Sequence, residues 1–287
     1  MKAQSRNKAN PFVSADFSPP SSECSGPWGT EILVQLEAVL RNPSRRAVHN
    51  LRRSCRVGQA LQDLLPHTED PLFRACQEIF RRTLRTTRKI RNADVLRAFL
   101  KRKRINLKDR FSRKRGVGRL RRRLKQIWAP ESREIFGSVC REISRQMEKD
   151  IPERLPGIDK EMDRVLQDLV TFYSLWSSGR EQDFSPVHEL RIHLKRIDGR
   201  DKILSGPKGR GGGLDETRKT DLHKILRLLG RMSDLLMMEE TFPRLEGKKT
   251  ERRRFQKKIR EFRIRTDTRI VRFLGSRVPE ASRPSAR

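Results

Sequence analysis

The sequence predicts an all-α protein, and three observations support this prediction. Apolar residues recur at helical spacing over most of the 287 residues. Two segments of this kind are preceded by typical helix starts, Ser44 in one case and Asp70 followed by Pro71 in the other. We find no convincing segment in which apolar and polar residues alternate with the period of two that marks a β-strand.

The helices follow one another along the chain with few long interruptions. Thr30 is expected to cap the first helix, and Ser44 a second one that runs to about Leu65. Residues 198–214 are rich in glycine and are expected to form a loop. One further helix is expected to begin at Asp70-Pro71, another at about Ala93 and another at about Ser185. Helices are also expected over 131–149, about 158–177 and roughly 248–274. One more is expected to carry the apolar residues of 222–236.

Composition divides the chain into tails and one helical domain. Residues 1–28 and 277–287 are expected to be flexible tails, because they show little apolar periodicity. The domain covers residues 29–276. Two prolines near residues 151–157 indicate a linker, which separates an N-terminal half (29–150) from a C-terminal half (158–276).

The charge of the chain points to an anionic partner. Lys and Arg total 67 against 36 Asp and Glu, a formal net charge of +31. A charge of this size attracts polyanions over long distances, so nucleic acid, anionic membrane and inorganic polyphosphate are all candidates. The four cysteines are scattered and fit neither a zinc site nor a disulfide framework. With no apolar span or signal region, we expect a cytoplasmic protein without a membrane span.

A short phrase occurs twice, about half the chain length apart. Val48-His49-Asn50-Leu51-Arg52 returns as Val187-His188-Glu189-Leu190-Arg191. The first copy continues to Arg56 and the second to Lys195 at the same offset, so each helix presents one histidine and two cations on one face. Arg offers a planar fork and Lys a point charge to phosphate oxygens. A solvated helix face is the alternative for one copy, but the duplication favours binding.

A second phrase follows each histidine helix at nearly the same distance. Arg91-Asn92-Ala93-Asp94-Val95-Leu96 matches Arg231-Met232-Ser233-Asp234-Leu235-Leu236, which is introduced by Leu229-Gly230. Preserved order and spacing indicate a duplicated unit. Asp94 and Asp234 could be metal ligands. The favoured interpretation is that they cap the helix after a turn, or pair with a cation.

These four phrases resemble the motifs of the CHAD family, the conserved histidine α-helical domains. The resemblance covers roughly residues 30–275. It implies two antiparallel helical bundles related by a pseudo-two-fold axis, with a shared basic groove that binds inorganic polyphosphate, and association with polyphosphate granules in the cytoplasm. The expected polyphosphate-binding residues are Arg45, His49, Arg52, Arg56, Arg91, His188, Arg191, Lys195, Arg196 and Arg231.

The chain departs from the family pattern in several places. Ile90 stands where the second copy has Gly230, and Ala93 and Ser233 replace the expected Arg or Asn. The glycine-rich segment after Arg196 is expected to shorten the second histidine helix.

We expect no enzymatic activity, cofactor, catalytic residue or metal site. The ExExK signature of the triphosphate-cleaving domains often attached to CHAD domains is absent, and the glycine-rich segment lacks P-loop spacing. The alternative function is nucleic-acid binding through the basic stretches 101–125 and 248–272, although no known nucleic-acid-binding signature supports it.

Overall fold

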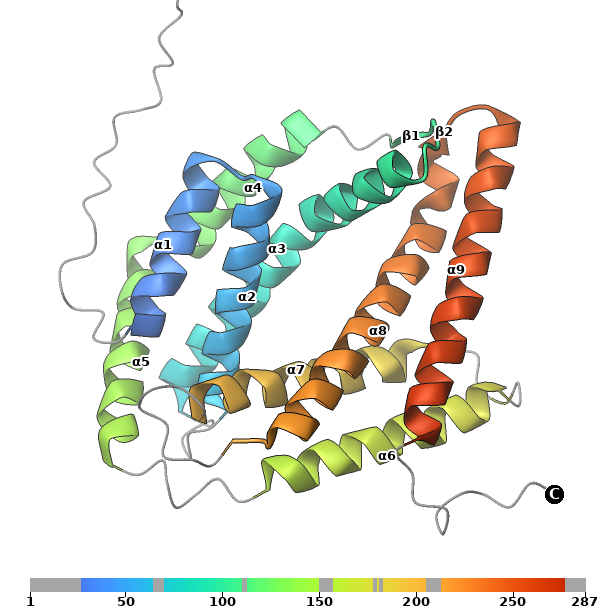
Figure 1. Ribbon diagram of the computed structural model, residues 1–287. Helices are drawn as coiled ribbons and strands as arrows, with labels where there is room; N and C mark the ends of the chain where they lie inside the picture. Colours follow the sequence, from blue (N-terminus) through green and yellow to red (C-terminus); the bar gives the residue numbers. More distant parts are fainter. Residues whose placement is uncertain are drawn as a thin grey trace, which may run out of the picture.

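The computed structural model describes residues 27–63, 70–109, 113–149, 157–177, 180, 183–204 and 213–276, and within them the protein is predominantly helical (Figure 1). The predicted fold class is confirmed at this level. The predicted tails, apart from Pro27 and Trp28, and all but the last residue of the predicted linker lie outside the described residues. No helix in these ranges has an apolar segment that could cross a bilayer.

Besides the helices, the described residues form one antiparallel strand pair, in which Lys108 lies opposite Glu246. The elements in chain order are α1 (Pro27–Arg41), α2 (Arg45–Gln62), α3 (Pro71–Arg102), β1 (Lys108–Asp109), α4 (Arg113–Ile127), α5 (Pro130–Lys149), α6 (Ile158–Ser177), α7 (Ser185–Leu204), α8 (Glu216–Thr241), the 3-10 turn η1 (Phe242–Arg244), β2 (Leu245–Glu246) and α9 (Lys249–Gly275).

Side-chain caps start α2, α3 and α8, three of the four helices that carry the repeated phrases. The Ser44 hydroxyl accepts a hydrogen bond from the Ala47 N–H at 3.1 Å and begins α2, as predicted. Asp70 accepts from the Leu72 N–H at 2.7 Å, with Pro71 at the first position of α3. Asp215 caps α8 in the same way. These short polar side chains satisfy backbone donors that have no partner within the helix.

Four predictions about helix boundaries are wrong. α1 begins at Pro27, so Thr30 lies inside the helix and does not cap it. No helix begins near Ala93, because α3 is continuous to Arg102, and α8 likewise runs through the second copy of the phrase. Residues 198–204, predicted to be a loop, form the last part of α7, which is therefore not shortened at Arg196.

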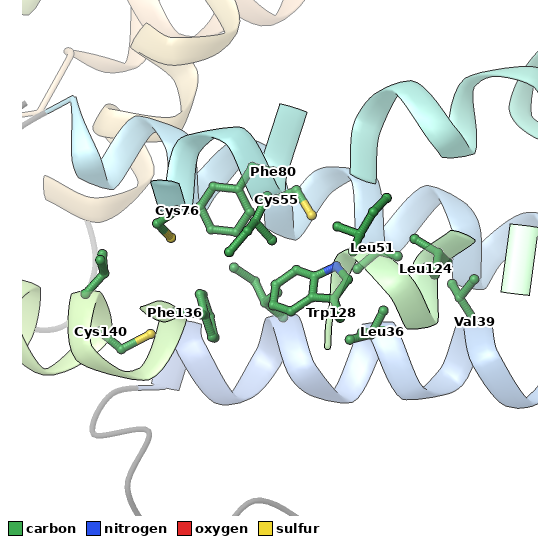
Figure 2. Close-up of a cluster of buried hydrophobic side chains, with 14 of the residues drawn as sticks. Leu36, Val39, Leu51, Cys55, Cys76, Phe80, Leu124, Trp128, Phe136 and Cys140 are labelled. Atoms are coloured by element: carbon green, nitrogen blue, oxygen red, sulfur yellow. The ribbon is translucent and has the colours of Figure 1, made fainter. Parts of the chain in front are cut away.

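The N-terminal helices α1–α5 enclose one hydrophobic core, built around Trp128. Figure 2 shows the Trp128 indole in the middle of this cluster, with Phe80 and Phe136 nearby. The Trp128–Phe136 ring centroids are 5.3 Å apart in an edge-to-face arrangement. The buried indole N–H donates to the Thr83 hydroxyl at 2.9 Å, so its polar atom is satisfied.

Two further cores complete the described structure. One lies among α6–α9, and the other joins the end of α3 to α8, β2 and α9, where Phe99 and Phe255 pack edge to face. Figure 1 shows α3 and α8 as the long helices that reach toward the same end of the molecule, where β1 and β2 lie. The third core therefore ties the two halves of the chain together by apolar packing.

α2 and α7 also join the halves, at a close helix crossing (Figure 1). Gly199 of α7 lies against Ala60 of α2, and a Cβ atom built on Gly199 would be 2.7 Å from the Ala60 Cβ. The glycine that suggested a loop instead lets two helices approach closely. This crossing determines how the two histidine helices face each other.

Candidate functional site

The structure brings the two repeated stripes together where α2 and α7 pack. Arg52 and Arg56 of α2, Arg191 and Lys195 of α7, and Arg91 of α3 are near enough for each to act electrostatically on others of the group. We call these five residues the cationic cluster. Its members come from both halves of the chain, so the cluster exists only because the halves are packed together.

Arg52 is fixed by hydrogen bonds to the middle of α3. Its Nη1 donates to the Thr87 hydroxyl at 2.7 Å and to the Leu84 carbonyl. Burial lowers its pKa to about 9, and repulsion from Arg56 and Arg91 adds to the effect. Arg52 therefore remains charged at neutral pH and anchors the α2 stripe on α3.

Neither Arg56 nor Lys195 has a carboxylate partner in a salt bridge among the described residues, and the charge of Arg56 acts on Lys195. The pKa of Arg56 is lowered by burial first and by Arg91 next. The pKa of Lys195 falls to about 5, because burial is reinforced by repulsion from Arg56, Arg191, Arg52 and Arg91. A half-buried arginine beside an amine that burial and repulsion keep neutral is a place where an external anion would be strongly stabilised.

Arg191 lies against the backbone of α8 at Gly230. A Cβ atom on Gly230 would be 3.3 Å from Nη2 of Arg191, so glycine leaves the space that the guanidinium occupies. The Nε atom of Arg191 is buried and has no hydrogen-bond partner. Burial and Arg56 lower the pKa of Arg191 to about 10, against the opposing effect of Asp234. The guanidinium of Arg191 thus keeps one donor that no protein acceptor satisfies.

Asp234 supplies negative charge to the cluster. Asp234 of α8 forms an ion pair with Arg91 of α3, and both side chains are about 30% exposed. Asp234 and Asp94 both lie inside continuous helices, so the prediction that they cap helices after a turn is wrong. The other part of that interpretation, pairing with a cation, is confirmed for Asp234.

The two histidines lie at the exposed margin of the cluster. Burial lowers the pKa of His49, and Arg56, Arg53, Arg91 and Arg45 act in the same direction. The pKa of His188 is also lowered by burial, with Arg191, Lys195 and Arg88 adding to it. Both imidazoles are therefore neutral at pH 7 in the free protein, and each offers one N–H donor.

The remaining predicted residues are placed less centrally. Arg45 is exposed one turn before His49 and contributes to its electrostatic environment. Arg196 is paired with Asp63 at 3.2 Å, at the end of α2, and so belongs to the helix crossing. Arg231 is exposed on α8 and is not among the main charges that act on the cluster.

Two residues near the site were missed by sequence reasoning. Arg88 is exposed one turn before Arg91 on α3, and its charge acts on both Arg52 and His188. The regular spacing Arg88–Arg91 on one helix face was the available signal. Gly230 was noted as part of a phrase, but its contact with Arg191 depends on tertiary packing.

The arrangement suits an anion with several charged oxygens better than a metal ion. Guanidinium groups from three helices converge with one lysine and two neutral imidazoles, and all of these can donate hydrogen bonds. No group of three or more His, Cys, Asp or Glu side chains within the described residues could hold a metal. A cavity of about 500 Å³ lies elsewhere, between α8 and α9, lined in part by Phe242, Phe255 and Glu239.

Comparison with known proteins does not assign a function to this site. No protein-family model matches the chain, and neither a curated protein nor a solved structure matches it.

Proposed function

We propose that this protein binds inorganic polyphosphate at the cationic cluster, without catalysing a reaction. The observation that supports the proposal is the convergence of the two repeated stripes on the same place, with Asp234 as the carboxylate that acts there. Polyphosphate is a chain of identical anionic units and offers no bases to be recognised. A site made of guanidinium, amine and imidazole donors fits such a ligand.

The resemblance of the repeated phrases to CHAD motifs supports the same proposal. In this view the chain is a CHAD protein, its halves are related by a pseudo-two-fold axis, and it associates with polyphosphate granules in the cytoplasm. Equivalent roles for the halves have a measurable consequence. Neutralising Arg52 alone or Arg191 alone should weaken binding by similar factors, because the two residues stand at the same offset from His49 and His188.

A titration with long-chain polyphosphate at about physiological salt tests the proposal. The informative variant carries Arg56→Gln and Arg191→Gln, and the matched control carries Arg253→Gln and Arg260→Gln on the exposed face of α9. Charged hydrogen bonds contribute about 1.5–3 kcal/mol each, so the cluster variant should lose at least about 100-fold in affinity. The slope of log K against log salt should also fall by about 2. Equal losses in both variants would contradict the assignment.

Nucleic-acid binding remains the second candidate, and the outer face of α9 favours it. Arg253, Arg254, Lys257, Arg260 and Arg269 are all exposed there, away from the cluster residues of α2 and α7. This function predicts the opposite pattern of mutational effects. RNA would compete with polyphosphate at comparable affinity, and the α9 control would lose RNA binding while the cluster variant kept it.

A further inference from the structure

Lys195 occupies an unusual electrostatic position within the cluster. It lies on α7 one turn after Arg191 and one turn before Gly199, where α7 touches α2 at Ala60. The charges of Arg52 and Arg56 of α2 and of Arg91 of α3 act on its amine. No carboxylate is among the main charges that act on its amine. Two acidic residues on the other helices packed on α7 pair with other cations. Asp234 of α8 is paired with Arg91, and Glu161 of α6 is paired with Arg200. No salt bridge or hydrogen bond of the Lys195 amine is found among the described residues.

A protonated amine in this position lacks both the water and the negative counter-charge that would stabilise it. Its half-buried position removes much of the water that would solvate an ammonium group. Four neighbouring cations repel it, whereas Arg side chains stay charged under such conditions. The Lys195 amine is therefore the group in the cluster that loses its proton, in agreement with its pKa of about 5.

We propose that capture of a phosphate anion by the cationic cluster is coupled to the uptake of one proton by Nζ of Lys195. The inference rests on the proposed polyphosphate binding and adds its regulation. The neutral amine takes a proton from the solvent, and the resulting ammonium pairs with a phosphate oxygen. No covalent bond forms or breaks. The anion supplies the counter-charge that the fold does not provide.

The coupling has a definite sign. Because the bound state holds one more proton than the free state, affinity rises as the pH falls, by up to about tenfold per pH unit over the coupled range. His49 and His188 can contribute in the same way near their unperturbed pKa of about 6.5. At pH 8 an imidazole, whose unperturbed pKa is about 6.5, stays neutral with or without the anion. Lys195 has an ordinary pKa of 10.5, so it can take up a proton at pH 8 once the anion is bound, and it dominates proton uptake there.

Titration calorimetry of the full chain at pH 8 with long-chain polyphosphate measures the uptake directly. Binding enthalpies in two buffers with different ionisation enthalpies give the number of protons taken up per occupied site. We expect about one. Lys195→Arg is expected to bind without this uptake, because its guanidinium is already charged, and the double variant His49→Gln/His188→Gln is expected to retain it.

The outcomes separate this inference from the proposed function. Binding with no proton uptake, or with the same uptake in Lys195→Arg, would overturn the coupling while leaving polyphosphate binding intact. Absence of any polyphosphate binding to the native protein would overturn the proposed function and the coupling together.

Amine labelling tests the free state without a polyphosphate ligand. Acylation of Lys195 should be nearly independent of pH between 6.5 and 8.5, whereas a model lysine peptide in the same sample, with the ordinary pKa of about 10.4, should react about tenfold faster per pH unit. Mass spectrometry after digestion would follow both amines in one sample. A tenfold rise per pH unit at Lys195 would show a protonated amine and refute the inference. Protection of Lys195 by added polyphosphate is the expected result for the bound state.

Discussion

Replacing Gly199 with alanine perturbs the helix crossing that brings the two stripes together. The new Cβ atom would lie 2.7 Å from the Cβ of Ala60, whereas carbon atoms in contact are normally about 3.5–4.0 Å apart. α2 and α7 must therefore separate by about 1 Å at this point. Arg56 and Lys195 lie about one turn away on the two helices, so the cluster opens with the crossing.

The free-energy change follows from two opposing effects. Overpacking of a tight contact costs about 1–3 kcal/mol. Alanine in a helix interior is favoured over glycine by about 0.8–1 kcal/mol. The net effect of Gly199→Ala is thus a destabilisation of about 0–2 kcal/mol. Gly118 in α4 provides the matched control, because a Cβ atom there would meet nothing within 4 Å. Gly118→Ala should stabilise the protein by up to about 1 kcal/mol.

Urea denaturation and polyphosphate titration of the two variants give the test. Gly199→Ala should be less stable than Gly118→Ala by about 1–3 kcal/mol, the sum of the two effects above. It should also bind polyphosphate more weakly. Adding Ala60→Gly removes the opposing Cβ and should restore binding, which a double-mutant cycle would record as favourable coupling. If Gly199→Ala stabilises the protein as much as Gly118→Ala does, the close crossing is wrong.

Three other predictions concern the Asp234 counter-ion of the cluster, the pH dependence of stability due to Lys195, and the Trp128 hydrogen bond in the N-terminal core. Asp234→Asn should raise polyphosphate affinity about twofold to fivefold, the scale of a partly exposed pair, while Asp163→Asn at the remote Arg218 pair should leave it unchanged in the same titration. Lys195 has a folded pKa of about 5 against an ordinary 10.5, so the unfolded chain holds more protons between these values. Stability should therefore rise with pH over that window, and Lys195→Met should flatten the dependence in urea denaturation. Thr83→Val leaves the Trp128 N–H without its acceptor and should cost about 1–3 kcal/mol by the same measurement.

Local chemistry explains which helix boundaries could be predicted. Ser44 and Asp70 act within three residues of themselves, and both predicted helix starts are confirmed. The predicted helix start near Ala93 is wrong, because no glycine or proline interrupts the chain after Pro71 and α3 continues to Arg102. The loop predicted at Gly199 is wrong because the role of this glycine is not local. Its role depends on Ala60, which lies far away in the sequence.

The site was predictable as far as the repeat itself extends. Equal offsets from His49 and His188 predicted which cations share a helix face, and these cations do lie together. No pattern in the sequence states which faces of two helices will meet. The pairing of Arg196 with Asp63 and the placement of Arg191 over Gly230 are consequences of that meeting. Such contacts follow only from tertiary structure.

The distribution of acidic residues separates a binding role of the cluster from a structural one. Many of the described carboxylates form surface pairs within one helix, such as Glu78–Arg81 and Glu142–Arg145, whereas Arg56 has no such partner in the described ranges. If the cluster served folding, Arg56→Gln would destabilise the free protein. If it serves binding, the substitution relieves repulsion and should raise the free energy of unfolding by on the order of 1 kcal/mol. The native protein, but much less so the variant, should then gain thermal stability from added polyphosphate, because only a ligand that binds the folded state shifts the equilibrium. Thermal unfolding of both proteins, with and without polyphosphate, distinguishes the two roles, and a destabilised variant that still responds fully to polyphosphate would refute the binding role of Arg56.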